Sequence, residues 1–187
     1  MFGWKTTRIE LSLDVVGISV VKKQLIMYKQ VKDIVYGKKY QNLCRVPYHN
    51  HPKGCPNYGK RDDCPPCELI SDRIDVQKEI YVIFTSYPIG EFAEKLRVAH
   101  PEWSETPRQW YNCIRWQGTA RKLHRADLKE FQDRFPDLIV DQNPEALGID
   151  VSDMMLQAGI ELEWNYHEEH DRNRITYRVS VGGTKLN

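Results

Sequence analysis

Apolar and polar side chains alternate in three stretches of the chain, with the two-residue period of a β-strand that buries one face. Residues 8–16 show this alternation near the start of the sequence. Residues 160–166 and 175–181 show it near the end, where the polar run at 167–174 separates them. The pattern therefore predicts an early strand and a C-terminal β-hairpin.

A further stretch, residues 79–87, is almost continuously apolar and rich in β-branched and aromatic side chains. This composition predicts a strand at the centre of a sheet. Pro88 then fits the first turn of a helix that runs to about His100. A second helical stretch is predicted over residues 106–135, either continuous or broken at Gly118.

Shorter elements complete the predicted fold. Residues 138–140 suit a short strand, and residues 150–158 suit a short helix that Gly159 ends. The stretch at 24–36 fits either a short helix or a strand. Because strands and helices alternate only in part along the chain, the predicted class is α+β (mixed α/β), a small sheet with flanking helices.

The chain of 187 residues, 41% of them hydrophobic, is long enough to bury the core of one domain. Its charge is uneven, because residues 1–67 carry 12 Lys and Arg against 5 Asp and Glu, and the remainder carries 15 against 21. We therefore expect a single domain over residues 1–187, with a basic part at 1–70 and an α/β part at 71–187. A basic region favours acidic partners such as nucleic acid.

The sequence also bears on the cellular compartment. No apolar run approaches the ~20 residues that span a bilayer, and the first residues lack the apolar block of a signal peptide. Five cysteines are an odd number, which argues against a disulfide framework and for reduced thiols. We expect a cytoplasmic protein without membrane contacts, and the oligomeric state stays open.

Four of the five cysteines lie in one turn-rich stretch, residues 43–67, in which Pro, Gly and Asn are frequent. Intervals of ten, eight and two residues separate Cys44, Cys55, Cys64 and Cys67. Soft thiolates bind zinc and iron–sulfur clusters, and a long loop needs something other than secondary structure to hold it. The stretch therefore predicts a metal centre with these four cysteines as ligands.

The spacing favours an iron–sulfur cluster over zinc. Zinc ribbons and fingers generally use two close ligand pairs, and here only Cys64 and Cys67 form one. A [4Fe–4S] cluster is therefore the first expectation and zinc the alternative, with His49 or His51 as a substitute for one thiolate. The same C-x-x-C pair also fits a redox dithiol, although the surrounding βαβ pattern of such proteins is missing.

Basic side chains accompany the cysteines, among them Arg45, Lys60 and Arg61. Their charge has two interpretations. It could offset the negative charge of the thiolates, or it could bind an anionic substrate or nucleic acid beside the metal. These three residues are the candidate cofactor-binding side chains.

Other groups of reactive side chains are weaker candidates. On a helix, Cys113 and His124 would share the apolar face, which favours Cys113 as a small buried residue. The sequence leaves Cys113 open as a fourth ligand in place of Cys67. His167 and His170 lie in the predicted hairpin loop and lack the helical spacing of a zinc protease motif. The chain has neither a phosphate-binding glycine loop nor a G-x-S-x-G motif.

Two separated stretches form more specific motifs. The first is GCPNYGK at residues 54–60, followed by CPP at 64–66. The second is NPEALGIDV at residues 143–151, which leads to AGI at 158–160. In this order they are similar to the signature of an uncharacterised bacterial and archaeal family of predicted metal-binding proteins.

The resemblance implies a metal, in first place an iron–sulfur cluster, bound through Cys44, Cys55 and Cys64, with Cys67 as a fourth ligand. The chain departs from the family pattern because a second cysteine-containing segment is missing and Asn143 stands where a cysteine often precedes Pro-Glu-Ala. A single metal site is therefore implied.

Three functional hypotheses follow. The first is a cluster protein with a redox or cluster-assisted role on an anionic substrate. The second is a zinc-stabilised module that binds nucleic acid or another protein without catalysis. The third is a small interaction protein whose cysteines are merely structural. The sequence leaves open whether the protein is an enzyme.

Overall fold

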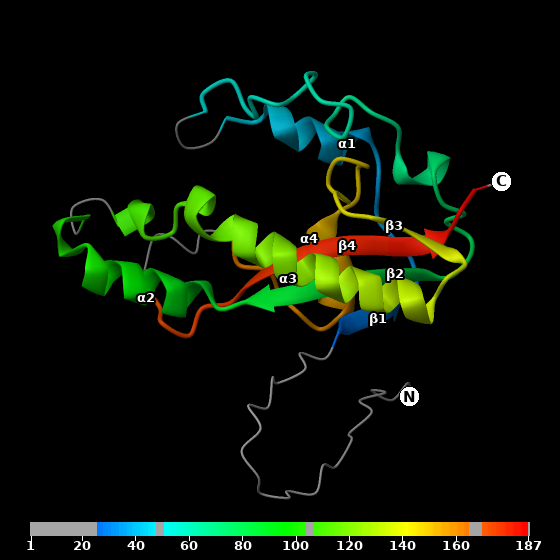
Figure 1. The fold of residues 1–187 in the computed structure, drawn as a ribbon. Coiled ribbons are helices and arrows are strands. Elements are labelled where there is room, and N and C mark those ends of the chain that lie inside the picture. Colours follow the sequence, from blue (N-terminus) through cyan, green and yellow to red (C-terminus); the bar gives the residue numbers. More distant parts are fainter. Residues whose placement is uncertain (1–25, 48–50, 104–106, 165–169, 187) are drawn as a thin grey trace, which may run out of the picture.

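The centre of the protein is a four-stranded antiparallel sheet (Figure 1). The computed structural model describes residues 26–47, 51–103, 107–164 and 170–186. In sheet order the strands are β1 (Met27–Val31), β2 (Ile80–Tyr87), β4 (Thr176–Thr184) and β3 (Leu138–Asp141).

The described residues also form four α-helices and four 3₁₀ turns. The α-helices are α1 (Lys38–Gln41), α2 (Ile89–Ala99), α3 (Cys113–Arg134) and α4 (Val151–Gln157). The 3₁₀ turns lie at Asn42–Arg45, Ile70–Asp72, Pro101–Trp103 and Pro107–Gln109. The predicted α+β class is thus confirmed, whereas the strand predicted at 8–16 lies outside the described residues. Within the described ranges, no helix is both long and apolar enough to cross a membrane.

Strand β2 is the central strand that its composition predicts. It pairs with β1 on one edge and with β4 on the other, so that Phe84 lies opposite both Met27 and Val179. Successive side chains of a strand point to opposite faces, and here both faces are covered. That is why the strand is apolar almost throughout and not only at every second residue. The neighbouring stretch at 24–36, which suited helix or strand, contains β1.

Helix α3 covers one face of the sheet (Figure 1). The Asn112 side chain caps the helix by accepting a hydrogen bond from the Ile114 backbone N–H at 3.1 Å. The helix therefore begins at Cys113, later than predicted, and it continues unbroken through Gly118. The C-terminal half of α3 packs against the sheet in a cluster of buried side chains formed by Tyr81, Ile83, Leu128, Phe131 and Leu138.

The opposite face of the sheet is covered by α4. Asp150 caps this helix by accepting a hydrogen bond from the Asp153 backbone N–H at 3.1 Å, and Gly159 ends it with a φ of 81°. The predicted helix at 150–158 and its glycine end are confirmed. The larger apolar core lies here and includes Val82, Val181, Ile149, Met154 and Met155.

The predicted C-terminal hairpin is wrong. Residues 161–163 form no strand, and the two neighbours of β4 are β2 and β3, both distant in sequence. After the turn at Gly159 the chain stays beside α4, where the Trp164 indole N–H donates to the Ser152 hydroxyl at 3.3 Å. Glu163 and Arg174 are joined by an ion pair at 2.9 Å, so side chains and not a backbone ladder connect the two stretches.

A chain of buried polar side chains joins α3 to the sheet. Thr85 donates a hydrogen bond to Asp127, so its oxygen accepts from Nδ1 of His124 at 2.8 Å. Nε2 of His124 then accepts from the Ser180 hydroxyl at 2.7 Å. Both ring nitrogens are thus engaged in the neutral form of the imidazole. Burial lowers the pKa of His124 to about 4.

This pKa makes folding stability depend on pH. In the unfolded chain His124 titrates near its ordinary pKa of about 6.5, so between about pH 6.5 and pH 4 the unfolded state binds more protons than the folded state. We expect stability to fall as the pH is lowered through this window, by up to about 3 kcal/mol from His124. Burial raises the pKa of Asp127, which opposes the effect at the acidic end. Urea unfolding from pH 7 to pH 4 measures the slope.

The control for this prediction is His124→Gln, which keeps an amide able to hydrogen-bond but removes the titrating ring. The pH dependence of the variant should be shallower than that of the wild type between pH 6.5 and pH 4. Parallel curves for the two proteins would contradict the assignment to His124.

Candidate metal centre

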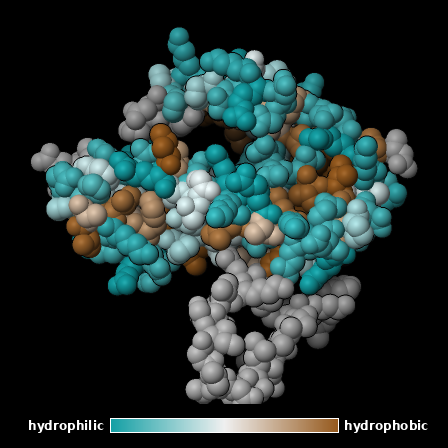
Figure 2. Space-filling model, in the orientation of Figure 1, coloured by the Kyte–Doolittle hydropathy of each residue, from teal (hydrophilic) through white to brown (hydrophobic). Residues whose placement is uncertain are grey.

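The cysteine-rich stretch and α1 form a lobe above the sheet, drawn in blue to cyan in Figure 1. The loop is folded back on itself by backbone hydrogen bonds. Cys55 N–H donates to the Cys44 carbonyl at 2.6 Å, and Gly59 N–H donates to the Pro65 carbonyl at 2.7 Å. Figure 2 shows that the surface is hollowed between this lobe and the body of the protein.

Gly54 is the residue that lets the loop close beside Cys44. It adopts a φ of 79°, and a Cβ atom at this position would lie 2.5 Å from the Cys44 carbonyl oxygen. Only glycine fits such a close backbone approach. The GCP part of the first motif thus has a physical reason, which is to bring Cys44 and Cys55 together.

The four thiols of the loop share one neighbourhood. Burial raises the pKa of Cys44, and electrostatic interactions with Cys55 and Cys64 raise it further. All four thiols are free and partly exposed. Within the described ranges, however, no three His, Cys, Asp or Glu side chains are close enough to hold a metal ion. The donor set suits iron–sulfur or zinc chemically, and ligation would draw these thiols closer together.

Cys67 differs from the other three cysteines of the loop. Its thiol donates to the Ala146 carbonyl at 3.1 Å and packs against the larger apolar core. The side-chain amide of Gln41, which is buried, contacts the Cys67 carbonyl at 3.0 Å and the Ala146 carbonyl at 2.9 Å. Cys67 therefore ties the loop to the segment at 143–148.

The predicted cofactor-binding cations have separate local roles. Arg61 forms a bidentate ion pair with Asp63, with both contacts at 2.9 Å, so its charge is locally neutralised. The Arg45 guanidinium lies over the Tyr58 ring at 5.8 Å. The side chain of Lys60 is exposed.

Two further sequence predictions concern ligands outside the four cysteines. Cys113 is exposed and not buried as predicted, because it is the first residue of α3 and precedes the covered part of the helix face. Among the histidines, His51 is partly buried, and His49 lies outside the described residues.

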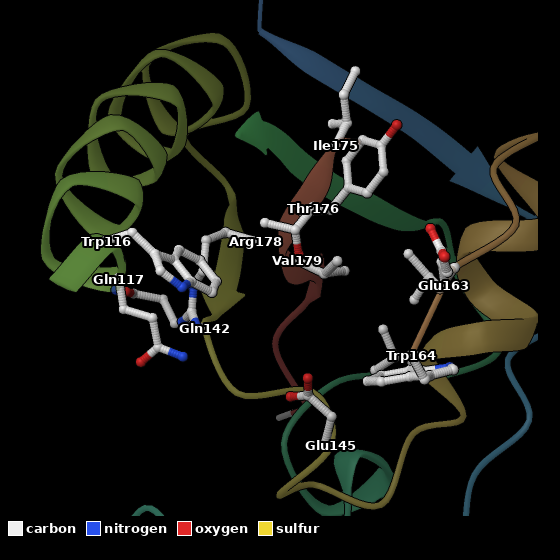
Figure 3. A pocket seen from close by; sticks show the side chains of 13 residues that line it. Trp116, Gln117, Gln142, Glu145, Glu163, Trp164, Ile175, Thr176, Arg178 and Val179 are labelled. Carbon is white, nitrogen blue, oxygen red and sulfur yellow. The ribbon is translucent and has the colours of Figure 1, made fainter. Parts of the chain in front are cut away.

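A pocket of about 390 Å³ lies beside β4 (Figure 3). Its walls come from the start of α3, the turn after β3, the start of α4, the stretch before residue 165 and β4. The polar and aromatic side chains that line it are Trp116, Gln117, Gln142, Glu145, Glu163, Trp164, Thr176, Tyr177 and Arg178.

Arg178 is a charged residue of this pocket that no sequence motif singled out. Its Nε atom is buried and has no hydrogen-bond partner among the described residues. Burial lowers the pKa of Arg178, and the Glu145 carboxyl opposes that shift. The structure shows why: Arg178 shares a face of β4 with Ser180, which is fully buried, so it points inward and not to bulk solvent. The sequence contains no signal of this burial.

The segment at 143–148, part of the second motif, connects the pocket to the cysteine loop. The Glu145 side chain lines the pocket and is accessible from it. The protein atoms around the carboxyl group remove much of its hydration, which raises its pKa. The same carboxyl also raises the pKa of Cys44. At the end of the segment, the Gly148 carbonyl accepts from the N–H of Gly37, the residue that precedes α1, at 2.8 Å. This hydrogen bond holds the segment against the lobe.

Comparison with protein-family models, with curated proteins and with solved structures finds no match to this chain. The resemblance to predicted metal-binding proteins therefore stays a prediction that rests on the two motifs. The candidate metal centre accordingly rests on the donor chemistry of its cysteines and on the loop that gathers them.

Proposed function

We propose that the protein binds a metal centre, in first place one [4Fe–4S] cluster, through Cys44, Cys55, Cys64 and Cys67. Its function would be a redox or cluster-assisted role on an anionic substrate. A zinc-stabilised module that binds nucleic acid or protein is the alternative. When bound, an iron–sulfur cluster would supply electron transfer or an open iron that polarises a substrate oxygen.

The observation that carries the proposal is the gathering of four free cysteines in one loop that backbone hydrogen bonds fold back on itself. Cys55 N–H donates to the Cys44 carbonyl at 2.6 Å, and electrostatic interactions with Cys55 and Cys64 contribute to the raised pKa of Cys44. Thiols gathered in one irregular loop, each of them free, form a donor set for a soft metal. The hydrogen bond of Cys67 to Ala146 favours Cys44, Cys55 and Cys64 as the principal ligands.

Whether Cys67 binds the metal decides how many coordination positions stay open. If Cys67 exchanges its hydrogen bond for the metal, all four ligand positions come from the loop. If it stays with Ala146, one metal position is open to a substrate or to solvent. Arg45 and Lys60, both exposed, are then the loop cations available to an anionic substrate.

Anaerobic purification of the full chain tests the proposal. We expect a brown protein with absorbance near ~400 nm and about four iron and four sulfide per chain. A colourless protein with one zinc per chain would establish the alternative. Protein that retains neither metal after reconstitution would contradict both.

A further inference from the structure

Arg178 stands in the pocket with a buried Nε atom that has no partner among the described residues. A guanidinium removed from water destabilises the fold unless acceptors replace its hydration. Glu145 interacts with it electrostatically, but Figure 3 shows the two side chains on different walls of the pocket. The Nε atom itself is closed to the pocket, but Arg178 as a whole is partly exposed and lines it, so a ligand would meet the terminal guanidinium nitrogens. The unpaired Nε atom shows that the described residues compensate this cation incompletely.

At the same place, the edge of β4 extends beyond its pairing with β3. Strand β3 pairs with β4 only from Val181 to Thr184, whereas β2 pairs with it along Thr176 to Gly183. Between Thr176 and Ser180, no described strand covers the edge on the β3 side. Since an uncovered strand edge leaves main-chain donors and acceptors unpaired, this wall of the pocket can form further hydrogen bonds.

The other walls restrict the kind of molecule that fits. Trp116 and Trp164 stand on opposite sides of the pocket (Figure 3), and Leu162 and Val179 contribute apolar surface. A volume of about 390 Å³ lies in the range of small-molecule sites. Of the two carboxyl groups in the lining, Glu163 is neutralised by its ion pair with Arg174, and burial raises the pKa of Glu145, which favours its neutral form. Arg178 therefore suits a ligand with a single negative charge, and the terminal nitrogens of its planar guanidinium match a carboxylate through two hydrogen bonds.

We infer that this pocket is a binding site for a small organic monocarboxylate. The carboxylate pairs with Arg178, and a flat apolar body lies against the tryptophan walls. The inference rests on the pocket alone and does not require a metal in the cysteine loop.

Nuclear magnetic resonance of the ¹⁵N-labelled full chain tests the inference, with phenylacetate as the probe. Titration to about 10 mM, a range that suits a fragment of this size, should shift the indole N–H signals of Trp116 and Trp164 in a saturable way. Phenylacetamide, the uncharged isostere, should bind about tenfold or more weakly, because it cannot form the charged pair. Inorganic phosphate, which lacks the apolar body, should also bind more weakly.

Variants assign the effect to Arg178. Arg178→Met should weaken phenylacetate binding by about tenfold to a hundredfold. Arg178→Lys keeps the charge but loses the paired hydrogen bonds of the guanidinium, so its affinity should lie between those of the wild type and Arg178→Met. The Arg178→Met protein should melt no lower than the wild type, because the substitution removes a partly desolvated cation. Arg125→Met, which removes one exposed charge from α3 outside the pocket, should leave binding unchanged.

Several results would overturn the inference. The first is the absence of any saturable shift at Trp116 or Trp164 with phenylacetate. The second is equal binding of phenylacetamide or of phosphate. The third is unchanged binding in both Arg178 variants. Metal content, measured in the same samples, reports separately on the cysteine loop.

Discussion

The Cys64→Ala variant is expected to lose its bound metal and to melt well below the metal-loaded wild type. In the loop at 43–66, the described residues beyond the 3₁₀ turn form no helix, and the loop cysteines are only partly buried, so apolar packing contributes little to its order. Metal binding energy in such loops becomes folding energy, and for structural zinc it reaches about 10 kcal/mol or more. Metal analysis and thermal unfolding of the same preparations measure both effects.

Two comparisons separate loss of metal from loss of a side chain. In chelator-treated protein, Cys64→Ala should differ from the wild type by less than ~1 kcal/mol, because a partly exposed thiol makes few contacts. Cys113→Ala, at an exposed cysteine outside the loop, should keep both metal and melting temperature. A Cys64→Ala protein that retained full metal content would remove Cys64 from the ligand set.

Gly90→Ala is expected to destabilise the protein by about 3 kcal/mol or more. Gly90 lies in the first turn of α2, where its N–H donates to the Arg174 carbonyl at 2.9 Å. A Cβ atom there would lie 2.1 Å from the Asp171 carbonyl oxygen and 2.5 Å from that of Arg172. These are backbone atoms that cannot rotate away, so either the helix or the segment from residue 170 must move. Urea unfolding measures the change.

Gly118→Ala is the matched control, since it makes the same substitution inside a helix. Gly118 is exposed in α3, and a Cβ atom there would contact nothing within 4 Å. Alanine should therefore stabilise the protein by up to about 1 kcal/mol through its higher helix propensity. If both substitutions shifted the unfolding midpoint in the same direction, the close approach at Gly90 would not be the cause.

Elements whose signals are local could be predicted from the sequence. Strand β2 follows from an apolar run, and α4 follows from the Asp150 cap and the Gly159 end, all of which act within a few residues. The hairpin prediction failed because alternation at 160–166 shows which face a stretch would bury but not which strand it pairs with. The partner of β4 was decided by β2 and β3, which lie far away in the sequence.

The same distinction applies to the sites. The cysteines stand close together along the chain, so their spacing alone is enough to propose them as a group. The pocket is made from segments that lie far apart in the sequence, as Trp116 and Arg178 illustrate. Arg178 looked like an ordinary polar position of an alternating strand, and only packing reveals that its Nε atom is buried with no acceptor among the described residues.

The position of the segment at 143–148 has a thermodynamic consequence. Its Ala146 carbonyl accepts from Cys67, and its Glu145 side chain lines the pocket, so one short piece of chain belongs to both places. If a metal draws Cys67 away from Ala146, the affinity of the pocket for its ligand changes by some factor. Linkage requires that the ligand change the affinity for the metal by the same factor.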